Sequence, residues 1–221
     1  MIELVGVTKT YDSGKNRVAA LRGVDFELGS SDYLAIQGPS GAGKSTLLNV
    51  IGLLDEPTTG SILLNRECVS ELDDKRRSDL RNQVFGFVFQ RFNLLPELNA
   101  WQNVALPGRY GGRSRRERRT RALELLADVG LQDRADHLPA ELSGGEEQRV
   151  AIARAVFMSP KMILADEPTG NLDSTLAQQI LSLFAEIHQQ GVALTIVTHE
   201  PSVVASARRT IHLVDGRVVL S

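Results

Sequence analysis

The sequence has little that would place it in an oxidising compartment or inside a membrane. It has one cysteine, Cys68, in 221 residues, so no disulfide can form within the chain and a reducing compartment is allowed. The longest apolar run, residues 47–54, is about eight residues and includes Asn49 and Gly52, whereas a membrane-spanning helix needs about 20 apolar residues. The N-terminus also lacks the basic start and apolar stretch of a secretory signal. We therefore expect a soluble, cytoplasmic protein.

A strong excess of charge of either sign is also absent. The chain has 25 Lys and Arg against 27 Asp and Glu, a formal net charge of −2. Because binding to nucleic acid depends on neutralising phosphates with Lys and Arg, we expect no nucleic-acid partner. The local exception is residues 113–121, where six arginines open a predicted helix. This segment could be a surface for nucleic acid or acidic lipid, or a face that docks a partner. It could also be a solvated helix face with an i, i+4 ion pair between Glu117 and Arg121, and this is the interpretation we favour.

What the chain does contain is an alternation of short apolar runs with longer amphipathic ones. From Tyr33 onward this alternation predicts βαβ units and a mostly parallel sheet. The first thirty residues instead predict short antiparallel strands with turns, and residues 99–159 are mainly helical. The strands are expected at residues 2–7, 24–28, 33–37, 84–88, 162–165, 193–197 and 211–214. The fold class is therefore predicted to be α/β, with an antiparallel N-terminal β piece.

A phosphate-binding loop follows one of the predicted strands. Residues 38–45 match the pattern G-x-x-x-x-G-K-S/T between a strand and a helix, where its glycines let backbone N–H groups surround phosphate oxygens. The helix N-terminus favours negative charge, Lys44 can reach the terminal phosphates and the Ser45 hydroxyl can bind Mg²⁺. The expected nucleotide contacts from this loop are Gly38, Pro39, Ser40, Gly41, Ala42, Gly43, Lys44, Ser45 and Thr46.

Two acidic residues end a second apolar strand. Asp166 and Glu167 follow residues 162–165 directly, and carboxylates at the end of a buried strand are costly unless they have a role. We expect Asp166 to hold Mg²⁺, directly or through water, and Glu167 to act as the base or to orient the attacking water.

Polar side chains follow two further strands. Gln90 comes after residues 84–88 and His199 after residues 193–197. In open α/β sheets, ligands bind beyond the carboxyl ends of the strands, so we expect both near the phosphate loop, with Gln90 offering an oxygen to Mg²⁺ and His199 hydrogen-bonded to the γ-phosphate. Taken singly, Gln90 could be an ordinary loop amide and His199 a neighbour of the helix start at Pro201.

The sequence Leu-Ser-Gly-Gly-Glu at residues 142–146 opens another helix. Ser143 and Glu146 have the spacing of a capping box, which explains a helix start but not the paired glycines Gly144 and Gly145. Bare backbone amides at a positive helix end predict a second site for an anion.

With this motif, which we call the signature, the sequence resembles the ATP-binding-cassette (ABC) ATPases over essentially the whole chain. The resemblance implies that Tyr11 stacks on adenine, that residues 171–173, including Asp173, form a loop at the dimer contact, and that Gln90 and His199 are the family's loop glutamine and switch histidine. It also implies a P-loop NTPase core at residues 1–90 and 160–221 and a helical subdomain at residues 91–159. Ser143, Gly144 and Gly145 would contact the ATP bound by a second copy.

Three segments are similar to the lipoprotein-release and macrolide-export cassettes, namely residues 52–60, 87–96 and 165–173. The sequence departs from the family pattern at two places. Ala42 stands where serine is more usual, and Glu146 and Glu147 stand where glutamines are frequent. The second departure leaves Glu146 without a firm role as a ligand. The resemblance implies a homodimer around two Mg-ATP that drives separate permease subunits from the cytoplasmic face of the inner membrane, for export or extraction of lipoprotein, drug or peptide.

Other classes of ABC ATPase remain as alternatives. Chromosome-type members insert long coiled coils between the phosphate loop and the signature, whereas about 97 residues separate Ser45 from Leu142 here. Translation-type members carry two cassettes in one chain, and this chain has one. A cell-division or regulatory cassette, or a DNA-repair type, is the alternative hypothesis, and the membrane partner would discriminate between them.

Overall fold

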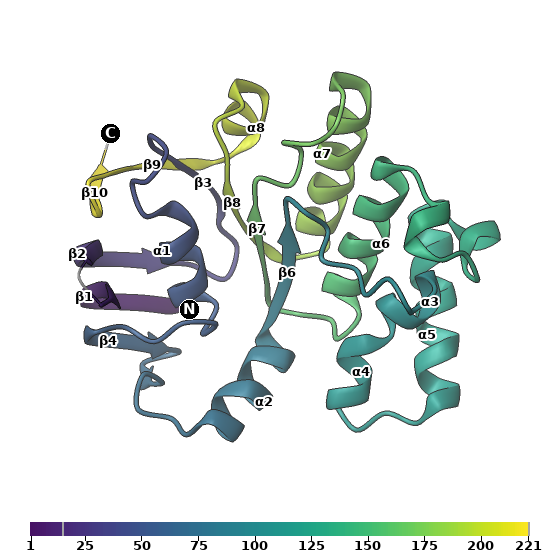
Figure 1. Cartoon of the computed structure of the whole chain (residues 1–221), viewed down its shortest axis with the longest axis horizontal. Helices are drawn as coiled ribbons and strands as arrows, with labels where there is room; N and C mark the ends of the chain where they lie inside the picture. Colours follow the sequence, from purple (N-terminus) through teal and green to yellow (C-terminus); the bar gives the residue numbers. More distant parts are fainter. Residues whose placement is uncertain (15, 221) are drawn as a thin grey trace. The chain divides into compact units, whose positions relative to one another are not determined.

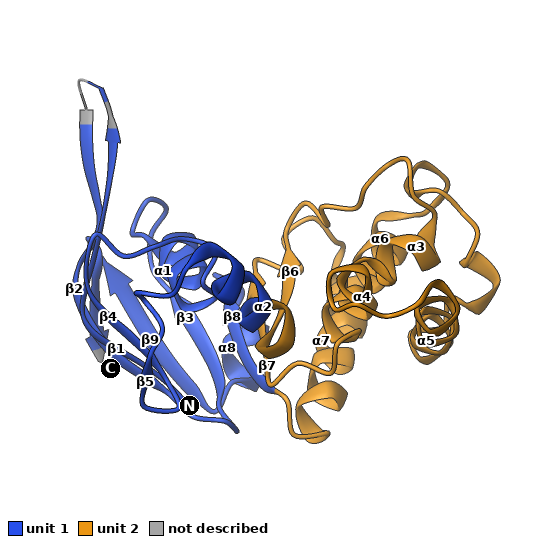
Figure 2. Cartoon of the chain, turned by 90° about the horizontal axis from the view of Figure 1, so that it is seen from below, with its two compact units in different colours: residues 1–81, 193–221 blue, residues 82–192 orange. Residues whose placement is uncertain are grey.

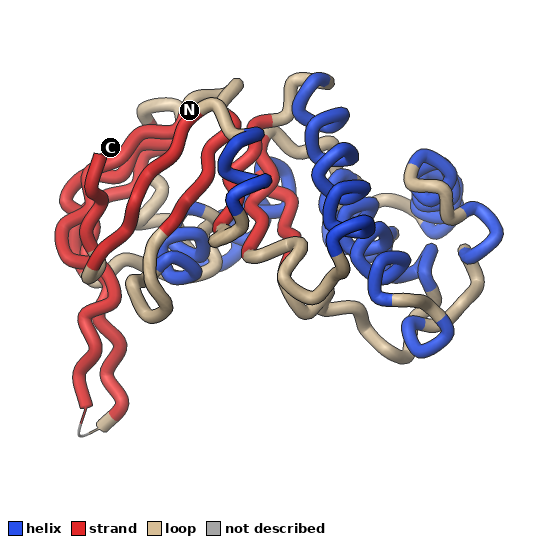
Figure 3. Tube along the Cα trace, turned by 90° about the horizontal axis from the view of Figure 1, so that it is seen from above, coloured by secondary structure: helices blue, strands red, loops and turns tan. Residues whose placement is uncertain are grey.

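Two compact units make up the chain in a computed structural model, which describes residues 1–14 and 16–220. The first unit contains residues 1–81 and 193–221, and the second contains residues 82–192 (Figure 2). Strands dominate the first unit and helices the second (Figure 3). Within the described ranges, none of the helices combines the length and apolar character needed to cross a bilayer.

The first unit contains an antiparallel sheet of order β2-β1-β4-β5 (Figure 1). Its strands are β1 (Ile2–Ser13), β2 (Asn16–Leu28), β4 (Thr59–Leu64) and β5 (Glu67–Cys68). Alternate residues such as Ile2, Leu4, Phe26 and Leu28 are buried, as expected for strands with one face on a core. The β1–β2 hairpin runs further than residues 2–7 and 24–28, because its polar half continues the ladder past bulges.

The second sheet of this unit is mainly parallel, with the order β10-β9-β3-β8. The strands are β3 (Tyr33–Gln37), β8 (Ala193–Val197), β9 (Arg209–Val214) and β10 (Arg217–Leu220). β3 pairs in parallel with both β8 and β9, and every residue of β8 is buried. Three helices accompany these strands: α1 (Lys44–Ile51), α2 (Asp74–Val84), which ends just past the boundary of the unit, and α8 (Pro201–Ser206).

The second unit combines two parallel strands with a helical cluster. Its elements are β6 (Phe85–Phe89), β7 (Met162–Asp166), α3 (Ala100–Val104), α4 (Leu106–Tyr110), α5 (Arg115–Asp128), α6 (Gly144–Val156), α7 (Ser174–Gln189) and two single 3₁₀ turns, Gln132–Arg134 and Pro139–Glu141. Trp101, Leu126, Val150 and Phe157 belong to one buried apolar cluster that holds α3, α5 and α6 together. This packing gives the signature helix α6 a rigid support.

The arginine-rich segment forms the start of α5, but not with the ion pair that the spacing predicted. Glu117 caps the helix instead, since its carboxylate accepts from the backbone N–H and hydroxyl of Ser114 at 2.8 and 2.6 Å. Arg121 pairs with Glu124 at 3.5 Å, so the expected Glu117–Arg121 pair is wrong. The guanidinium of Arg119 lies 5.7 Å from the ring centre of Trp101, so part of the basic segment packs on its own helical cluster.

The α/β fold class with an antiparallel N-terminal sheet is confirmed. The predicted core, residues 1–90 with 160–221, and the predicted helical subdomain, residues 91–159, have other bounds than the two compact units. That division into subdomains stays a prediction.

Candidate nucleotide-binding site

The phosphate loop leaves β3 and ends in helix α1, as the motif requires. Gly43 is the N-cap of α1 with φ of 99°, and no described side chain caps this helix end. A Cβ on Gly38 would lie 2.1 Å from the carbonyl oxygen of Leu213, and one on Gly43 would lie 2.3 Å from that of Ala20. Because both positions admit glycine alone, the loop keeps its backbone N–H groups accessible at a positive helix end.

Lys44 lies across its own loop. Its ammonium donates to the carbonyl oxygens of Gly38 at 2.8 Å and Pro39 at 3.1 Å. Ser45 is exposed in the first turn of α1, whereas the methyl group of Ala42 is buried. The side chain at position 42 is therefore packed inside the first unit.

Tyr11 lies on β1 and is 40% exposed. Its hydroxyl donates to Asp55 Oδ2 at 2.6 Å. Partial burial and the Asp55 carboxylate raise the pKa of Tyr11, while a hydrogen bond between its hydroxyl and Thr46, in the first turn of α1, lowers it. The first unit therefore brings Tyr11 to the phosphate loop.

His199 comes two residues after β8, which pairs in parallel with β3. The backbone N–H of Thr198 donates to the carbonyl of Ile36 at 3.1 Å, and this anchors the segment at the end of β3. His199 is exposed at this edge. The first unit thus places His199 at the same strand edge from which the phosphate loop leaves, as predicted.

In the second unit, Gln90 and Asp166 stand at the ends of paired strands. β6 and β7 are parallel, with Phe89 opposite Asp166. Asn171 donates to the backbone carbonyl of Gln90 at 2.8 Å and accepts from its side-chain amide at 3.5 Å. The segment after β7 is therefore tied to the glutamine that follows β6.

Glu167 has a left-handed backbone, with φ of 46°, which is strained for a residue with a side chain. Gly170 donates to its carbonyl at 3.1 Å, and a Cβ on Gly170 would lie 3.0 Å from Gln90 Nε2 and 3.5 Å from Glu167 Oε2. The side chains of Gln90 and Glu167 thus border the same glycine. Strained residues of this kind cluster where geometry serves function.

The signature helix α6 begins with the capping box that the sequence predicted. Glu146 accepts from the backbone N–H and the hydroxyl of Ser143, both at 2.8 Å, and pairs with Arg134 at 3.1 Å. The hydrogen bond from the Ser143 backbone is the main reason that the pKa of Glu146 is lowered. Glu146 thus has the capping role that the sequence predicted.

The two signature glycines differ in their surroundings. A Cβ on Gly145 would lie 3.0 Å from Leu176 Cδ2, whereas the nearest atom to one on Gly144 would be Phe92 Cζ at 3.8 Å. Gly145 is therefore required by the packing of α6 on α7, whereas a Cβ on Gly144 would make only ordinary contacts. Asp173, expected in the dimer-contact loop, is the N-cap of α7 and accepts from Thr175 and Leu176.

Three residues that hold the site segments in place were not predicted from the sequence: Asp55, Gln148 and Arg154. Gln148 is fully buried, and its side-chain amide donates to the carbonyl of Pro168 at 2.5 Å. Arg154 donates to the carbonyls of Phe92 at 2.7 Å and Asn93 at 2.6 Å, and burial lowers its pKa to about 10. These contacts link positions about 20 to 62 apart in sequence, and no local pattern signals them.

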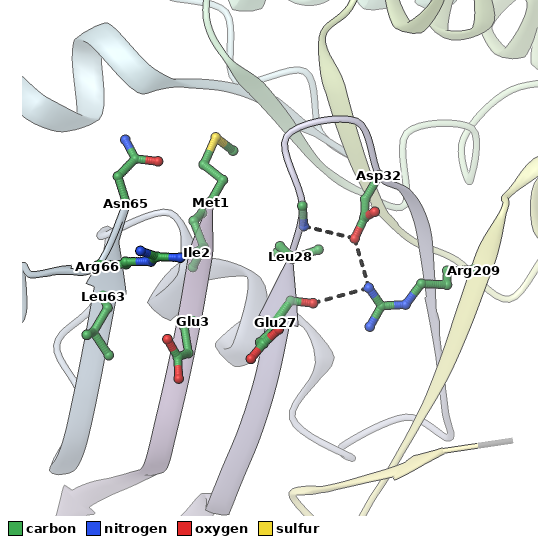
Figure 4. Close-up of a pocket in the computed structure, with 11 residues that line it drawn as sticks. Met1, Ile2, Glu3, Glu27, Leu28, Asp32, Leu63, Asn65, Arg66 and Arg209 are labelled. Carbon is green, nitrogen blue, oxygen red and sulfur yellow. Dashed lines mark hydrogen bonds and ion pairs between the residues drawn. The ribbon is translucent and has the colours of Figure 1, made fainter.

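A cavity of about 800 Å³ in the first unit is lined by no residue of the phosphate loop and by neither Tyr11 nor His199 (Figure 4). Its lining includes Gly29 and Asp32, which precede β3, whereas the phosphate loop follows it. Asp32 pairs with Arg209 at 2.8 Å and accepts from the Gly29 backbone, so it closes the turn before β3. We therefore give this cavity no part in nucleotide binding.

Comparison with known proteins agrees with the motifs. A family model described as ABC transporter matches residues 21–170. An ABC transporter ATP-binding protein of Thermotoga maritima is 51% identical over 218 residues, covering 99% of this chain and 93% of that protein, and YvrO of Bacillus subtilis is 47% identical over 220 residues, covering 100% and 96%. The macrolide export ATP-binding/permease protein MacB of Marinobacter nauticus is 44% identical over 219 residues, which are 99% of this chain and 34% of MacB.

Solved structures of the ABC cassette MJ0796 agree with the fold. A dimeric post-hydrolysis state bound to ADP and Pi has a TM-score of 0.91 and 43% identity, and covers 99% of this chain and 96% of that chain. A second dimeric MJ0796 structure gives the same TM-score at 44% identity. The chain thus belongs to the ABC transporter family and is an ATP-hydrolysing cassette of that family.

Proposed function

We propose that this cassette is the ATPase subunit of a membrane transport complex, in which two copies close around two Mg-ATP and drive separate permease subunits. The observation that carries the proposal is that one chain holds both helix N-termini that a shared ATP site needs. One follows Gly43 in the phosphate loop, and the other follows Ser143 in the signature. A homodimer is therefore sufficient to complete two sites.

The residues of the phosphate loop bind the nucleotide. The backbone N–H groups beside Gly41 and Gly43 donate hydrogen bonds to phosphate oxygens. The Lys44 ammonium gives up its hydrogen bonds to the loop carbonyls and binds the β- and γ-phosphates instead. Tyr11 stacks on the adenine, since its ring is partly exposed and its hydroxyl is hydrogen-bonded to Thr46 in the first turn of α1. The remaining loop contacts of the proposal are Gly38, Pro39, Ser40, Ala42 and Ser45.

Hydrolysis is assigned to residues at the strand ends. Glu167 orients or deprotonates the attacking water, and His199 hydrogen-bonds the γ-phosphate. The donor set of Ser45, Gln90 and Asp166 consists of hydroxyl, amide and carboxylate oxygens, which suits Mg²⁺. The ion would neutralise charge on the β- and γ-phosphates.

The signature supplies the second half of each ATP site. The N–H groups of Gly144 and Gly145 at the start of α6, with the Ser143 hydroxyl, face the γ-phosphate held by the partner copy. Asp173 and the loop before it lie at the contact between copies. The dimeric MJ0796 structures, one of which holds ADP and Pi, support this arrangement.

The permease partner is proposed from the relatives. MacB is named as an ATP-binding and permease protein, and the present chain covers 34% of it. Since the described helices include no candidate membrane span, we assign the permease to other subunits and place the cassette on the cytoplasmic face of the inner membrane. The cargo would be a lipoprotein, drug or peptide that is exported or extracted.

The Glu167→Gln variant tests the proposal. We expect it to bind ATP, to lose nearly all hydrolysis and to accumulate as an ATP-dependent dimer in size-exclusion chromatography with light scattering, because the amide cannot accept the water's proton. Hydrolysis near the parent rate, or a monomer at saturating ATP, would contradict the assignment. Co-purification of the tagged chain from membranes should bring a multi-span permease; recovery of a nuclease-like protein instead would favour a DNA-repair cassette.

A further inference from the structure

Asp55 joins two residues of β1 that lie beside the phosphate loop. Its Oδ2 accepts the Tyr11 hydroxyl at 2.6 Å, and its Oδ1 accepts the Lys9 ammonium at 2.5 Å. Burial alone would raise the pKa of Asp55, but hydrogen bonds from Lys9 and Tyr11 lower it below its usual value. The carboxylate is therefore ionised at neutral pH and holds both partners through charge-assisted hydrogen bonds.

Lys9 covers one face of the Tyr11 ring. The two side chains are two residues apart on β1 and so project from the same side of the strand. The Lys9 ammonium lies 5.0 Å from the ring centre, and its side chain is only 13% exposed. Tyr11 itself is 40% exposed, so part of the ring stays accessible although Lys9 lies over it.

The segment that carries Asp55 is fixed to α1 and to β1. The backbone N–H groups of Leu54 and Asp55 donate to the carbonyl of Asn49 in α1, at 2.8 and 3.2 Å. On the other side, Thr58 donates to the carbonyl of Thr8 at 2.8 Å, and the Lys9 ammonium also donates to the carbonyl of Glu56 at 2.8 Å. Asp55 therefore holds the aromatic ring at a set position relative to the helix that binds phosphate.

We propose that Asp55 is a positioning residue for the nucleotide base, which fixes the Tyr11 ring, with Lys9 on its inner face, so that its free face meets the base. The inference rests on the proposed stacking role of Tyr11. A ring that is already held loses less side-chain freedom on binding. Because stacking does not depend on the identity of the base, the effect applies to ATP and GTP alike but not to a ligand without a base.

The test compares four proteins: the parent, Asp55→Asn, Tyr11→Phe and the double variant. Isothermal titration calorimetry would give the Kd for ATP, GTP and inorganic tripolyphosphate. Losing one ordered side chain corresponds to about a three- to tenfold rise in Kd. We expect each single variant to raise the Kd of both nucleotides by this factor, the double variant to add little, and the Kd of tripolyphosphate to stay unchanged.

Asp12→Asn is the matched control, because Asp12 is the exposed neighbour of Tyr11 and loses the same charge. We expect it to leave both nucleotide affinities within twofold of the parent. Tyr11→Phe keeps the ring and is partly exposed, so it remains informative if Asp55→Asn folds poorly in thermal denaturation.

Several results would overturn the proposal. One is an unchanged Kd for the nucleotides in Asp55→Asn. Another is a Kd for tripolyphosphate that rises as much as the Kd for ATP, because Asp55 would then support the conformation of the phosphate loop rather than the position of the base. A third is a double variant whose Kd rises by the product of the two single-variant factors. Such independence would show that the hydrogen bond between Tyr11 and Asp55 does not account for the effect on nucleotide affinity. Failure of the proposed function would look different, since the parent would then bind ATP without forming an ATP-dependent dimer or co-purifying with a permease.

Discussion

The carboxylate of Glu146 turns back on Ser143 and accepts both its backbone N–H and its hydroxyl at 2.8 Å. The serine of the motif at residues 142–146 is thus held by the glutamate that closes it. This cap fixes the direction in which the first N–H groups of α6 point. The direction matters because those groups are proposed to face the phosphate bound by a second copy.

Ser143→Arg separates nucleotide binding from catalysis. The phosphate loop lies in the other compact unit, so the variant should bind ATP with nearly the parent Kd as a single chain. Arginine at the N-cap puts a bulky group where the partner's γ-phosphate is expected, so hydrolysis should fall to background. A phosphate-release assay and a nucleotide-binding titration check the two outcomes. Loss of all ATP binding would contradict a site shared between copies.

Glu146→Gln should weaken α6 in a pH-dependent way. The hydrogen bonds from Ser143 lower the pKa of Glu146, so the ionised form stabilises the folded state. That contribution is present above the ordinary Glu pKa of about 4.3 and is lost as pH falls through the lowered value in the folded state.

Urea unfolding checks this prediction at two pH values. The variant should lose about 0.5 kcal/mol of unfolding free energy at pH 7, at the low end of N-cap effects because the site is partly exposed and glutamine keeps some capping ability. The difference should shrink as the pH falls from the ordinary Glu value through the lowered pKa of the folded state. A difference that grows on acidification would refute the assigned sign. Glu141→Gln, which replaces the capping carboxylate of the adjacent 3₁₀ turn, is a comparison within the same unit.

The paired glycines of the signature should respond in opposite ways to alanine. Gly145→Ala places a Cβ 3.0 Å from Leu176, so the free energy of unfolding should fall by about 1 kcal/mol. Gly144→Ala meets nothing closer than 3.8 Å and should not lose stability, yet its methyl group restricts the approach of a phosphate to the backbone and should lower the hydrolysis rate. Thermal denaturation and ATPase assays on both variants distinguish these effects. Equal stability losses would show that Gly144 is also a packing residue.

Sequence reasoning succeeded where a function depends on neighbours in the chain. The phosphate loop, the cap between Ser143 and Glu146 and the strand that ends at Asp166 all lie within single short segments. The bond between Tyr11 and Asp55 was not predicted, because 44 residues separate them and only the folded sheet brings them together.

A local rule also failed where two local interactions competed. The i, i+4 spacing predicted a pair between Glu117 and Arg121, but the Glu117 carboxylate binds the Ser114 backbone and hydroxyl at the helix start. A cap satisfies a backbone donor that has no partner within the helix, whereas an exposed ion pair contributes only a few tenths of a kcal/mol.

Arg154→Lys should uncouple the segment after Gln90 from α6. Arg154 is mostly buried, and its guanidinium holds two carbonyls, those of Phe92 and Asn93, at 2.7 and 2.6 Å. Both residues have left-handed backbones, with φ of 56° and 50°, so this conformation depends on outside support. A lysine ammonium cannot reproduce the planar fork of the guanidinium.

We expect a loss of about 2 kcal/mol in urea unfolding, as for weakening of hydrogen bonds from a charged donor. ATPase activity should fall with it, while the Kd for ATP should stay within about twofold, since the phosphate loop belongs to the other unit. Arg149→Lys is the control: its guanidinium is on the same helix but meets Gln179 at 3.4 Å rather than the segment after Gln90. If both lysine variants lose the same activity, the effect belongs to α6 as a whole, and Arg154 does not act through the segment that follows Gln90.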